Sequence, residues 1–390
     1  MAFELSSNSK IVVGLSGGVD SAVSAYLLKQ QGHEVLGLFM KNWDEDDTTE
    51  YCSAEADLKD VRQVCKTLDI ALETINFSDE YWKHVFSYFL EEHQAGRTPN
   101  PDILCNQEIK FKYFLDYAKK LGADFIATGH YAQRASHPLG LNKAADLNKD
   151  QTYFLCALNA HQLSQSYFPL HGLLKSEVRQ IAKKAGFENH AKKDSTGICF
   201  IGERKFNAFL AEYIPAKPGQ IRTADGQVLG KHNGLMFYTL GQRKGIHLGG
   251  MKNFQEKPWY VIGKAIDENA LIVSQTENDP WQFSTALIAT DINWITPIEQ
   301  TSFRCQAKTR YRQADQPCSV QRLENTLIVK FDFPQRAVTP GQSVVFYEGD
   351  RCLGGARIMG TNSPGGLWPK YPHCIRLPAF DFNVGATACL

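Results

Sequence analysis

Two kinds of hydrophobic pattern alternate along the first half of the chain. Apolar runs of about four to eight residues bounded by turn residues are typical of buried strands, and apolar residues recurring every three to four positions are typical of helices. The runs predict strands at 11–15, 34–40, 71–77 and 124–128, and the helical spacing predicts helices at 20–31, 53–68 and 175–186. Because helices separate the strands, we expect an α/β fold whose βαβ units build a doubly wound parallel sheet.

Beyond about residue 205 the chain becomes rich in glycine and proline, and strand-like stretches replace the alternation. Turn residues separate these stretches at short intervals, which is typical of small β domains, including barrels. The expected strands are 259–266, 271–274, 285–295, 302–312, 319–331 and 343–346. We therefore expect an α/β domain over 1–208, a central β-rich domain over 209–284, a C-terminal β-barrel over 285–380 and a tail over 381–390.

Composition narrows the class of protein. Of 390 residues, 43% are apolar and 22% are charged, which excludes a largely disordered chain, a collagen and a simple coiled coil. The 42 Lys and Arg residues balance 42 Asp and Glu residues, so a polyanionic partner would have to meet a local patch. No apolar run approaches the roughly 20 residues that span a bilayer, and the polar N-terminus lacks a signal-peptide core. We therefore expect a cytoplasmic protein with no membrane partner.

The ten cysteines are scattered and include no Cys-x-x-Cys pair. A long chain without a signal peptide keeps most of its thiols reduced, and a zinc ribbon or a cysteine-ligated cluster would need paired cysteines. The sequence therefore predicts no disulfide framework and no metal held by cysteine ligands.

The most specific motif is the string GLSGGVDS at 14–21, which lies between an expected strand and an expected helix. Its glycines allow the backbone to turn tightly and approach a ligand, and the free N–H groups at the start of the helix favour an anion. Asp20 is a candidate either to cap that helix or to help hold a phosphate-bound Mg²⁺. Met40 and Gly129 follow neighbouring strands, where ligands of open α/β sheets bind.

The loop differs from two common phosphate-binding motifs. It has no Gly-Lys-Ser/Thr, so it is not a Walker A loop, and it lacks the GxGxxG fingerprint of dinucleotide sites. The string SGGxDS instead resembles the loop of the N-type ATP pyrophosphatases, which implies that ATP is the ligand.

One cysteine with an unusual context is Cys105. Pro99 and Pro101 precede it and keep the segment before them out of a helix. A helix that starts near Pro101 would bring Asp102 and Cys105 onto one face. The carboxylate could exchange a proton with a bound substrate, although its negative charge would not favour a thiolate.

The other unusual cysteine is Cys199, which lies between Gly197 and Gly202 in what we expect to be a loop. Lys192 and Lys193 are close in sequence, and cations favour the thiolate form. Either cysteine alone would first be interpreted as a buried structural thiol. The presence of a nucleotide loop in the same chain makes a catalytic pair the stronger interpretation.

These motifs make the chain similar, over nearly its whole length, to the tRNA-specific 2-thiouridylase family. The segments that carry the resemblance are GLSGGVDS at 14–21, KNWDEDD at 41–47, YCSAEAD at 51–57, TPNPDILCN at 98–106, ATGHYA at 127–132, KDQTYFL at 149–155, KKDSTGICFIGER at 192–204 and YTLGQRKG at 238–245. The phosphate loop alone would not separate this family from GMP synthetase, argininosuccinate synthetase or tRNA-lysidine synthetase. The two cysteine motifs do.

The resemblance implies an enzyme, a tRNA-uridine 2-sulfurtransferase that uses ATP with Mg²⁺ and produces AMP and pyrophosphate. The O2 atom of the wobble uridine is adenylated, and sulfur then replaces it at C2. Cys199 is implied to carry the sulfur as a persulfide, and Cys105 to release it, leaving a Cys105–Cys199 disulfide for a reductant to reset. Direct attack by the persulfide and release as hydrosulfide both stay open. Asp102 is the implied acid or base.

The resemblance also assigns binding residues. It implies an ATP site at Gly14, Leu15, Ser16, Gly17, Gly18, Val19, Asp20, Ser21, Met40 and Gly129. It implies tRNA contacts at Asn100, Pro101, Asp102, His130, Lys149, Asp150, Gln151, Arg310, Tyr311 and Gln342. The implied partners of a monomeric enzyme are tRNA, with lysine, glutamate and glutamine acceptors, and a relay protein that delivers persulfide sulfur. The stretch 133–148 is only weakly basic, where family members often carry a basic segment, so phosphate contact is not expected there.

The segment 302–312 gives an independent indication of a polyanion partner. If the whole segment is one strand, its alternation sends Arg304, Lys308, Arg310 and Arg312 to one face. A cationic face could meet tRNA phosphates on a protein with no net charge, although a solvated strand face would show the same pattern.

Three other functions stay open on the residues alone. A ligase of the ATP pyrophosphatase type that acts on a small molecule would need neither a cationic β domain nor two loop cysteines. An RNA-binding protein with a vestigial nucleotide site would have a degraded loop, whereas the SGGxDS residues are all present. A thiol–disulfide oxidoreductase would normally carry a Cys-x-x-Cys motif.

Overall fold

The computed structural model describes residues 3–43, 53–193, 206–249 and 254–364. The predictions for Cys199 and the tail 381–390 therefore fall outside the described residues. Among the described residues, no helix is both long and apolar enough to cross a membrane.

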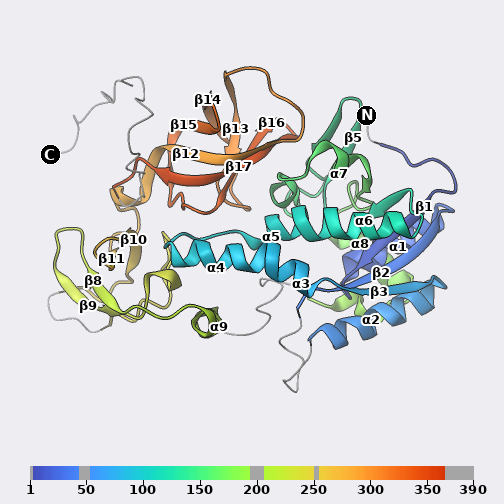
Figure 1. The fold of residues 1–390 in the computed structure, drawn as a ribbon, viewed down its shortest axis with the longest axis horizontal. Coiled ribbons are helices and arrows are strands. Elements are labelled where there is room, and N and C mark those ends of the chain that lie inside the picture. Colours follow the sequence, from blue (N-terminus) through green and yellow to red (C-terminus); the bar gives the residue numbers. More distant parts are fainter. Residues whose placement is uncertain (1–2, 44–52, 194–205, 250–253, 365–390) are drawn as a thin grey trace.

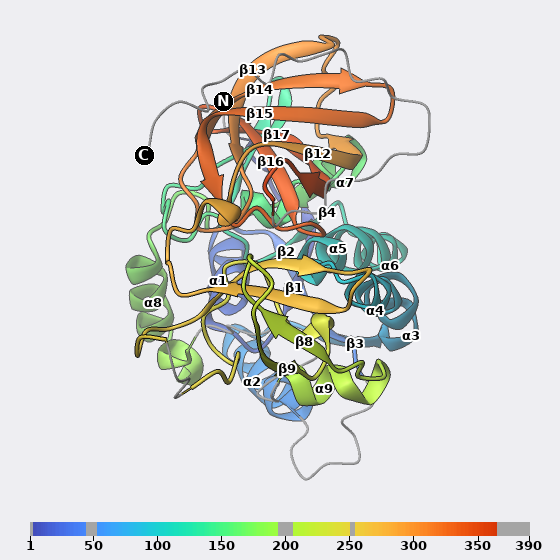
Figure 2. The same ribbon diagram turned by 90° about the vertical axis from the view of Figure 1, so that its left-hand side faces the viewer.

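A parallel sheet forms the base of the N-terminal half, as predicted. Its strand order is β3-β2-β1-β4-β7. Alternate residues of β1 face opposite sides: Ile11 and Val13 pack with α1, α2 and α8, whereas Val12 packs with the helices of the other side. Figure 2 shows α1 and α8 on one side of the sheet and α4 to α6 on the other. The bounds are β1 (Lys10–Leu15), β2 (Glu34–Lys41), β3 (Leu72–Asn76), β4 (Phe125–Ala127), β7 (Ser166–Tyr167), α1 (Val19–Gln30), α2 (Ser53–Leu68) and α8 (Lys175–Lys184).

A run of helical segments covers the second face of this sheet and passes beneath the C-terminal domain (Figure 1). It comprises α3 (Ser78–Tyr81), the π-helical η2 (Trp82–Phe86), α4 (Ser87–Gln94), α5 (Pro101–Leu104), the π-helical η3 (Cys105–Tyr113) and α6 (Phe114–Lys120). Their buried aromatic residues, among them Phe86, Phe89, Phe111 and Phe114, form the largest core of the molecule together with residues from the later domains. This shared core fixes the helical run relative to all parts of the protein.

The later part of the chain begins with α9 (Phe206–Tyr213) and a four-stranded sheet of order β10-β11-β8-β9. The strands are β8 (Gly219–Arg222), β9 (Val228–His232), β10 (Tyr260–Ala265) and β11 (Ala270–Ser274). Elsewhere in the described residues lie the short helical segments η4 (Thr152–Leu155), α7 (Ala160–Ser164), η5 (Glu188–Ala191), η6 (Leu235–Phe237) and η7 (Pro280–Gln282).

The C-terminal strands close into a six-stranded barrel, because the order β12-β15-β14-β13-β16-β17 is completed by pairing of β12 with β17. Apolar side chains such as Leu287, Val329 and Val344 fill its core. The hairpin of β5 and β6 adds to β17, so the weakly basic stretch 133–148 extends the barrel sheet. The bounds are β5 (Gln133–Ser136), β6 (Leu139–Asn142), β12 (Phe283–Trp294), β13 (Ser302–Lys308), β14 (Gln316–Leu323), β15 (Thr326–Arg336), β16 (Ser343–Glu348) and β17 (Arg351–Thr361).

Two strand predictions in this region are wrong. The segment 319–331 is a hairpin of β14 and β15, not one strand, and its turn contains Glu324 with a positive φ of 50°. The segment 302–312 is a strand only to Lys308, after which the chain turns. Neither turn contains a glycine or a proline, so the usual sequence signals were missing.

Candidate functional site

The phosphate loop lies between the end of β1 and the start of α1. Gly17 has a φ of +73°, which favours glycine, and Gly18 is the N-cap of α1. The Ser16 N–H donates to the Ser21 hydroxyl (3.2 Å), which donates to the Gly18 carbonyl (3.1 Å). These two bonds tie the loop to the first turn of α1, whose unpaired N–H groups favour an anion.

Glycines bring the neighbouring strand ends close to this loop. A Cβ atom on Gly129, just after β4, would lie 2.8 Å from the Ser21 nitrogen and 2.9 Å from the Asp20 carbonyl carbon. A Cβ atom on Gly14 would lie 3.5 Å from the Met40 methyl group, at the end of β2. The structure therefore gathers the predicted ATP residues at the carboxyl ends of β1, β2 and β4, where ligands of such sheets bind.

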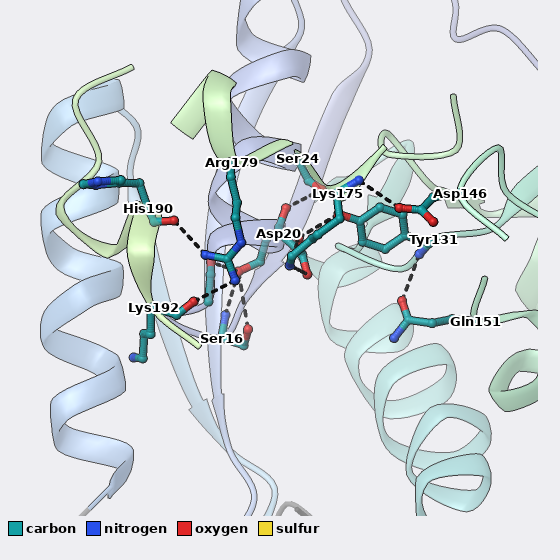
Figure 3. A network of polar contacts seen from close by, with 12 residues as sticks. Ser16, Asp20, Ser24, Tyr131, Asp146, Gln151, Lys175, Arg179, His190 and Lys192 are labelled. Carbon is teal, nitrogen blue, oxygen red and sulfur yellow. Dashed lines mark hydrogen bonds and ion pairs between the residues drawn. The ribbon is translucent and has the colours of Figure 1, made fainter. Parts of the chain in front are cut away.

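The carboxylate of Asp20 is the centre of a polar network (Figure 3). Lys175 Nζ lies 2.7 Å from each of its two oxygens, and the Tyr131 hydroxyl donates to Oδ1 (3.0 Å). The helix-capping role suggested for Asp20 is wrong, because Gly18 is the N-cap and no side chain caps α1. Lys175 is a residue that the sequence interpretation missed, since it lies 155 positions from Asp20 and at the start of α8.

A second lysine approaches the loop from another direction. Lys192 Nζ lies 2.8 Å from Asp57 Oδ1 and 2.6 Å from Asp60 Oδ2 on α2, and 3.4 Å from the Gly17 carbonyl. Its charge is therefore engaged with two carboxylates of α2. The Asn189 amide also donates to the Gly17 carbonyl (3.0 Å), so the chain before Cys199 braces the loop.

The segment with Asp102 and Cys105 has the predicted helix start. The Asn100 side chain is the N-cap of α5 and accepts a bond from the Asp102 N–H (3.2 Å), with Pro101 at the first position. The Cys105 thiol is buried, with 1% of the residue exposed, at the start of η3. Burial raises the pKa of Asp102, and the charge of Lys110 opposes part of that rise. A raised carboxyl pKa suits a group that must hold a proton.

Lys110 also acts on His130, which follows Gly129 at the edge of the nucleotide site. Burial lowers the pKa of His130 well below its usual value, and the charge of Lys110 lowers it further. The ring is therefore neutral near pH 7, and its Nδ1 lies 2.8 Å from the Thr128 hydroxyl. The ring centroids of His130 and of Phe111, which lies in the same η3 segment as Cys105, are 5.8 Å apart, so this segment packs against the edge of the nucleotide site. No local motif points to Lys110 as a site residue.

Four of the predicted tRNA-contact residues, Lys149, Asp150, Gln151 and Tyr311, take part in structural hydrogen bonds, one of which joins the catalytic half to the barrel. The buried Asp150 accepts bonds from the Ala144 N–H (3.1 Å) and the Thr152 hydroxyl (2.7 Å). Gln151 Oε1 accepts from the Tyr131 N–H (2.9 Å), which links it to the Asp20 network. The Tyr311 hydroxyl donates to the Lys149 carbonyl (3.4 Å). These bonds place residues 149–151 and Tyr311 side by side.

Two further predicted contacts, Gln342 and Arg310, hold backbone carbonyls. Gln342 Nε2 donates to the carbonyls of Thr98 (2.8 Å) and Pro99 (3.1 Å). Arg310 Nη2 donates to the carbonyls of Leu240 (3.1 Å) and Ala337 (2.8 Å). Both side chains therefore join the barrel to other parts of the chain.

The prediction of a cationic strand face is wrong. Because β13 ends at Lys308, Arg310 and Arg312 do not continue its alternation. Arg304 is paired with Asp332 (2.5 Å), and Lys308 lies 3.5 Å from Asp315. The charges of β13 are thus matched by neighbouring carboxylates.

Three family models match the chain in succession. The tRNA methyl transferase HUP domain matches residues 9–203, the tRNA methyl transferase PRC-barrel domain matches 207–275 and the aminomethyltransferase beta-barrel domain matches 284–358. Together they match most of the length of the chain, in the order in which the parallel sheet, the central sheet and the barrel occur.

Curated relatives match over most of their length. The chain is 56% identical to the tRNA-specific 2-thiouridylase MnmA of Pseudomonas entomophila over 90% of this chain and 94% of that one. It is 58% identical to the enzyme of the same name from Proteus mirabilis, over 90% of this chain and 97% of that one. Among solved structures, a 4-thiouridine synthetase–RNA complex with bound ATP matches 52% of this chain and 49% of that chain, with 16% identity and a TM-score of 0.32.

Proposed function

This chain belongs to the tRNA-specific 2-thiouridylase family, and from that premise we propose that it exchanges oxygen for sulfur at C2 of the wobble uridine of tRNA. The observation that carries the proposal is the contact between η3, which begins at Cys105, and His130, beside the phosphate loop: the ring centroids of Phe111 and His130 are 5.8 Å apart. The charge of Lys110, also in η3, acts on both Asp102 and His130. A base held between the two would have an activating nucleotide on one side and a thiol on the other.

The proposed nucleotide is ATP, and the loop residues fit it. The N–H groups at the start of α1 and the ammonium of Lys175 offer positive charge to phosphates, while Gly129 leaves room for a close approach. The carboxylate of Asp20 is an oxygen donor of the kind that Mg²⁺ prefers, so it could hold the ion that accompanies ATP. In this proposal Gly14 to Ser21, Met40 and Gly129 bind ATP.

The proposed reaction has two covalent stages. The uridine O2 displaces pyrophosphate from the α-phosphate of ATP, which turns a poor leaving group into AMP. Sulfur from a Cys199 persulfide then bonds to C2 and AMP departs. Cys105 then attacks Cys199 Sγ and breaks its bond to the transferred sulfur, which stays on C2, and the resulting Cys105–Cys199 disulfide needs two electrons from a dithiol reductant. Asp102 is proposed to move the proton at the base, which its raised pKa supports.

The remaining assignments complete the proposal. The tRNA would contact Asn100, Pro101, Asp102, His130, Lys149, Asp150, Gln151, Arg310, Tyr311 and Gln342. The proposed domains are 1–208 for catalysis, 209–284 as the central domain, 285–380 for tRNA binding and 381–390 as a tail. Lysine, glutamate and glutamine tRNAs are the proposed substrates of a monomer, with a persulfide relay protein as the donor. A cytoplasmic location would supply the reductant.

One experiment tests the proposal. Purified enzyme is incubated with unmodified tRNA, ATP-Mg²⁺ and a persulfide donor, and nucleosides are analysed by mass spectrometry for wild type, Cys105→Ser and Cys199→Ser. We expect ATP-dependent 2-thiouridine from the wild type only. Mass spectrometry also distinguishes sulfur exchange from an added methyl group, the activity named by two of the matching family models. A methylated product, or thiouridine made equally by both variants, would refute the proposal.

A further inference from the structure

The short segment 97–99, just before the Asn100 cap, lies where all three parts of the protein meet. The Thr98 N–H donates to the Pro340 carbonyl of the barrel (3.0 Å), and its hydroxyl lies 3.2 Å from that of Thr239 in the central part. Gln342 binds the Thr98 and Pro99 carbonyls, as described above. A Cβ atom on Gly341 would lie 2.9 Å from the Thr98 backbone, so the backbones of these two segments are in contact. The carbonyls of Thr98 and Pro99 and the N–H of Thr98 are therefore held by other parts of the protein.

A buried charge cluster stands beside this segment. Glu92, at the end of α4, is only 3% exposed. Arg97 holds it with two nitrogens, one of them Nε at 2.7 Å from Oε2, and Arg357 Nη1 of β17 lies 3.5 Å from Oε1. Arg357 Nε also donates to Asp291 of β12 (2.6 Å). One buried carboxylate thus joins Arg97 to two strands of the barrel.

The barrel contacts of the segment and of the charge cluster belong to one rigid piece. The Gly341 N–H donates to the Ile358 carbonyl (2.8 Å), and the Ile358 N–H donates to the Gln342 carbonyl (2.8 Å). Ile358 is the residue after Arg357, so Arg357 and Gln342 are fixed to each other. Any shift of this edge of the barrel would move residues 97–99, and α5 starts two residues later.

We propose that Glu92 and Arg357 are positioning residues, which hold residues 97–99 to the barrel so that tRNA docked on the barrel finds Asp102 and Cys105 aligned with its target base. The inference rests on the proposed function. Its physical basis is that a buried ion pair adds little to stability but has strict geometry. Removing one partner leaves the other charge buried and unpaired, which displaces it.

The first test compares Glu92→Gln with Glu268→Gln. Glu268 is a matched control, because it also pairs with an arginine, Arg222, but at an exposed position of the central part. The rate of alkylation by iodoacetamide is measured by mass spectrometry at Cys105 and at Cys65, a buried thiol of α2. We expect Glu92→Gln to speed labelling of Cys105 by about tenfold. Loss of a charged hydrogen-bond partner costs on the order of 1–3 kcal/mol, and 1.4 kcal/mol corresponds to a tenfold change in the equilibrium for local opening. Labelling of Cys65, and both rates in Glu268→Gln, should change by less than about twofold.

The outcomes distinguish a local effect on the cysteine segment from a loss of global stability. An equal rise at Cys105 and Cys65 would mean that Glu92 only stabilises the fold, and no rise at Cys105 would mean that it does not hold the segment; either result overturns the inference. In steady-state thiolation, we expect kcat to fall by about tenfold and the KM for tRNA to change by less than about twofold. A variant with raised KM and normal kcat would also contradict the inference.

A second pair of variants covers the case in which Glu92→Gln does not fold. Arg357→Lys keeps the positive charge but lacks the planar guanidinium group that contacts both Glu92 and Asp291. Arg357→Met removes the charge. We expect kcat to decrease in the order wild type, Arg357→Lys, Arg357→Met, and Cys105 labelling to increase in the same order. If wild type makes no thiouridine, the proposed function fails, but the labelling comparison still tests whether the cluster holds the segment.

Discussion

The phosphate loop and the cysteine segment are built in different ways. The turn of the loop is closed by local bonds, because Ser16 and Ser21 are five positions apart, and distant residues such as Asn189 and Lys175 only add to it. The cysteine segment is held from a distance: Thr98 meets Thr239 across 141 positions and Gln342 across 244. The turn of the loop therefore needs only β1 and α1, whereas the segment requires all three parts of the protein to be in place.

This difference predicts two separate kinds of defect. Changes in the loop should weaken nucleotide binding whether or not tRNA is present. Changes around the segment should leave nucleotide binding intact and slow the chemistry on tRNA. Each of the following variants would sharpen or break that separation.

The largest effect is expected for Cys105→Ser. The side chain is buried, and serine has nearly the same shape, so the fold should persist. Loss of the proposed thiol should lower multiple-turnover thiolation on the order of a thousandfold, because a nucleophile cannot be replaced by its neighbours. Nucleotide affinity, measured by calorimetry, should stay within about twofold of wild type. Normal turnover would reduce Cys105 to a structural thiol.

Asp102→Asn should lower kcat by about a hundredfold or more, the usual contribution of a general acid or base. It should also stabilise the protein near pH 7. Burial raises the pKa of Asp102, so ionising this carboxyl in the folded state costs free energy once the pH rises through the folded pKa.

The stabilising effect of Asp102→Asn can be checked by measuring Tm against pH. The gain over wild type should be largest above the raised pKa and should vanish below the unfolded value of about 3.9, where both states of Asp102 are protonated. A Tm difference that does not vary with pH would show that Asp102 is not held in a pKa-raising site.

Lys175→Met should weaken ATP binding by about tenfold to a hundredfold, since it removes an ammonium at the phosphate loop. Lys184→Met is the matched control, because Lys184 is an exposed residue at the end of the same helix. The measurement is calorimetric titration with ATP-Mg²⁺ in the absence of tRNA. Equal affinities for the two variants would remove Lys175 from the nucleotide site.

The smallest effects are expected for alanine substitutions of two glycines. Gly129→Ala places a methyl group against the Ser21 nitrogen, and Gly341→Ala places one against the Thr98 backbone; each should cost about 1–3 kcal/mol of unfolding free energy. Only Gly129→Ala should weaken ATP binding, and only Gly341→Ala should slow thiolation at saturating ATP. Gly172→Ala is the control, since an added Cβ there meets no atom within 4 Å. Identical phenotypes for the first two variants would contradict the separation.

The sequence predicted the elements whose signals are local. The helix at 53–68 has the predicted bounds, and the strands β1 to β4 lie within a few residues of theirs, whereas the two-residue β7 was not predicted. The strand β17 was missed because Gly354, Gly355 and Gly360 weaken its strand pattern. The tertiary structure explains two of these glycines. Gly354 has a φ of +140°, and a Cβ atom on Gly355 would lie 2.8 Å from the Cys156 sulfur.

The same limit applies to the candidate site. The loop residues and Cys105 were predicted because each stands in a short motif with its own chemistry. Lys175, Lys110, Glu92 and Arg357 were not predicted, since an isolated charged residue on a helix or strand looks like a solvated one. Their partners become visible only when segments far apart in the sequence are brought together by the sheet and the barrel.

The most direct test of the central claim is to measure pyrophosphate and 2-thiouridine in the same reaction. Wild-type enzyme is mixed with unmodified tRNA, ATP-Mg²⁺ and a persulfide donor, and both products are quantified over the first turnovers. The account predicts one pyrophosphate for each 2-thiouridine, and neither product at a normal rate when tRNA is omitted. Pyrophosphate released without thiouridine, in response to a small molecule in place of tRNA, would contradict it.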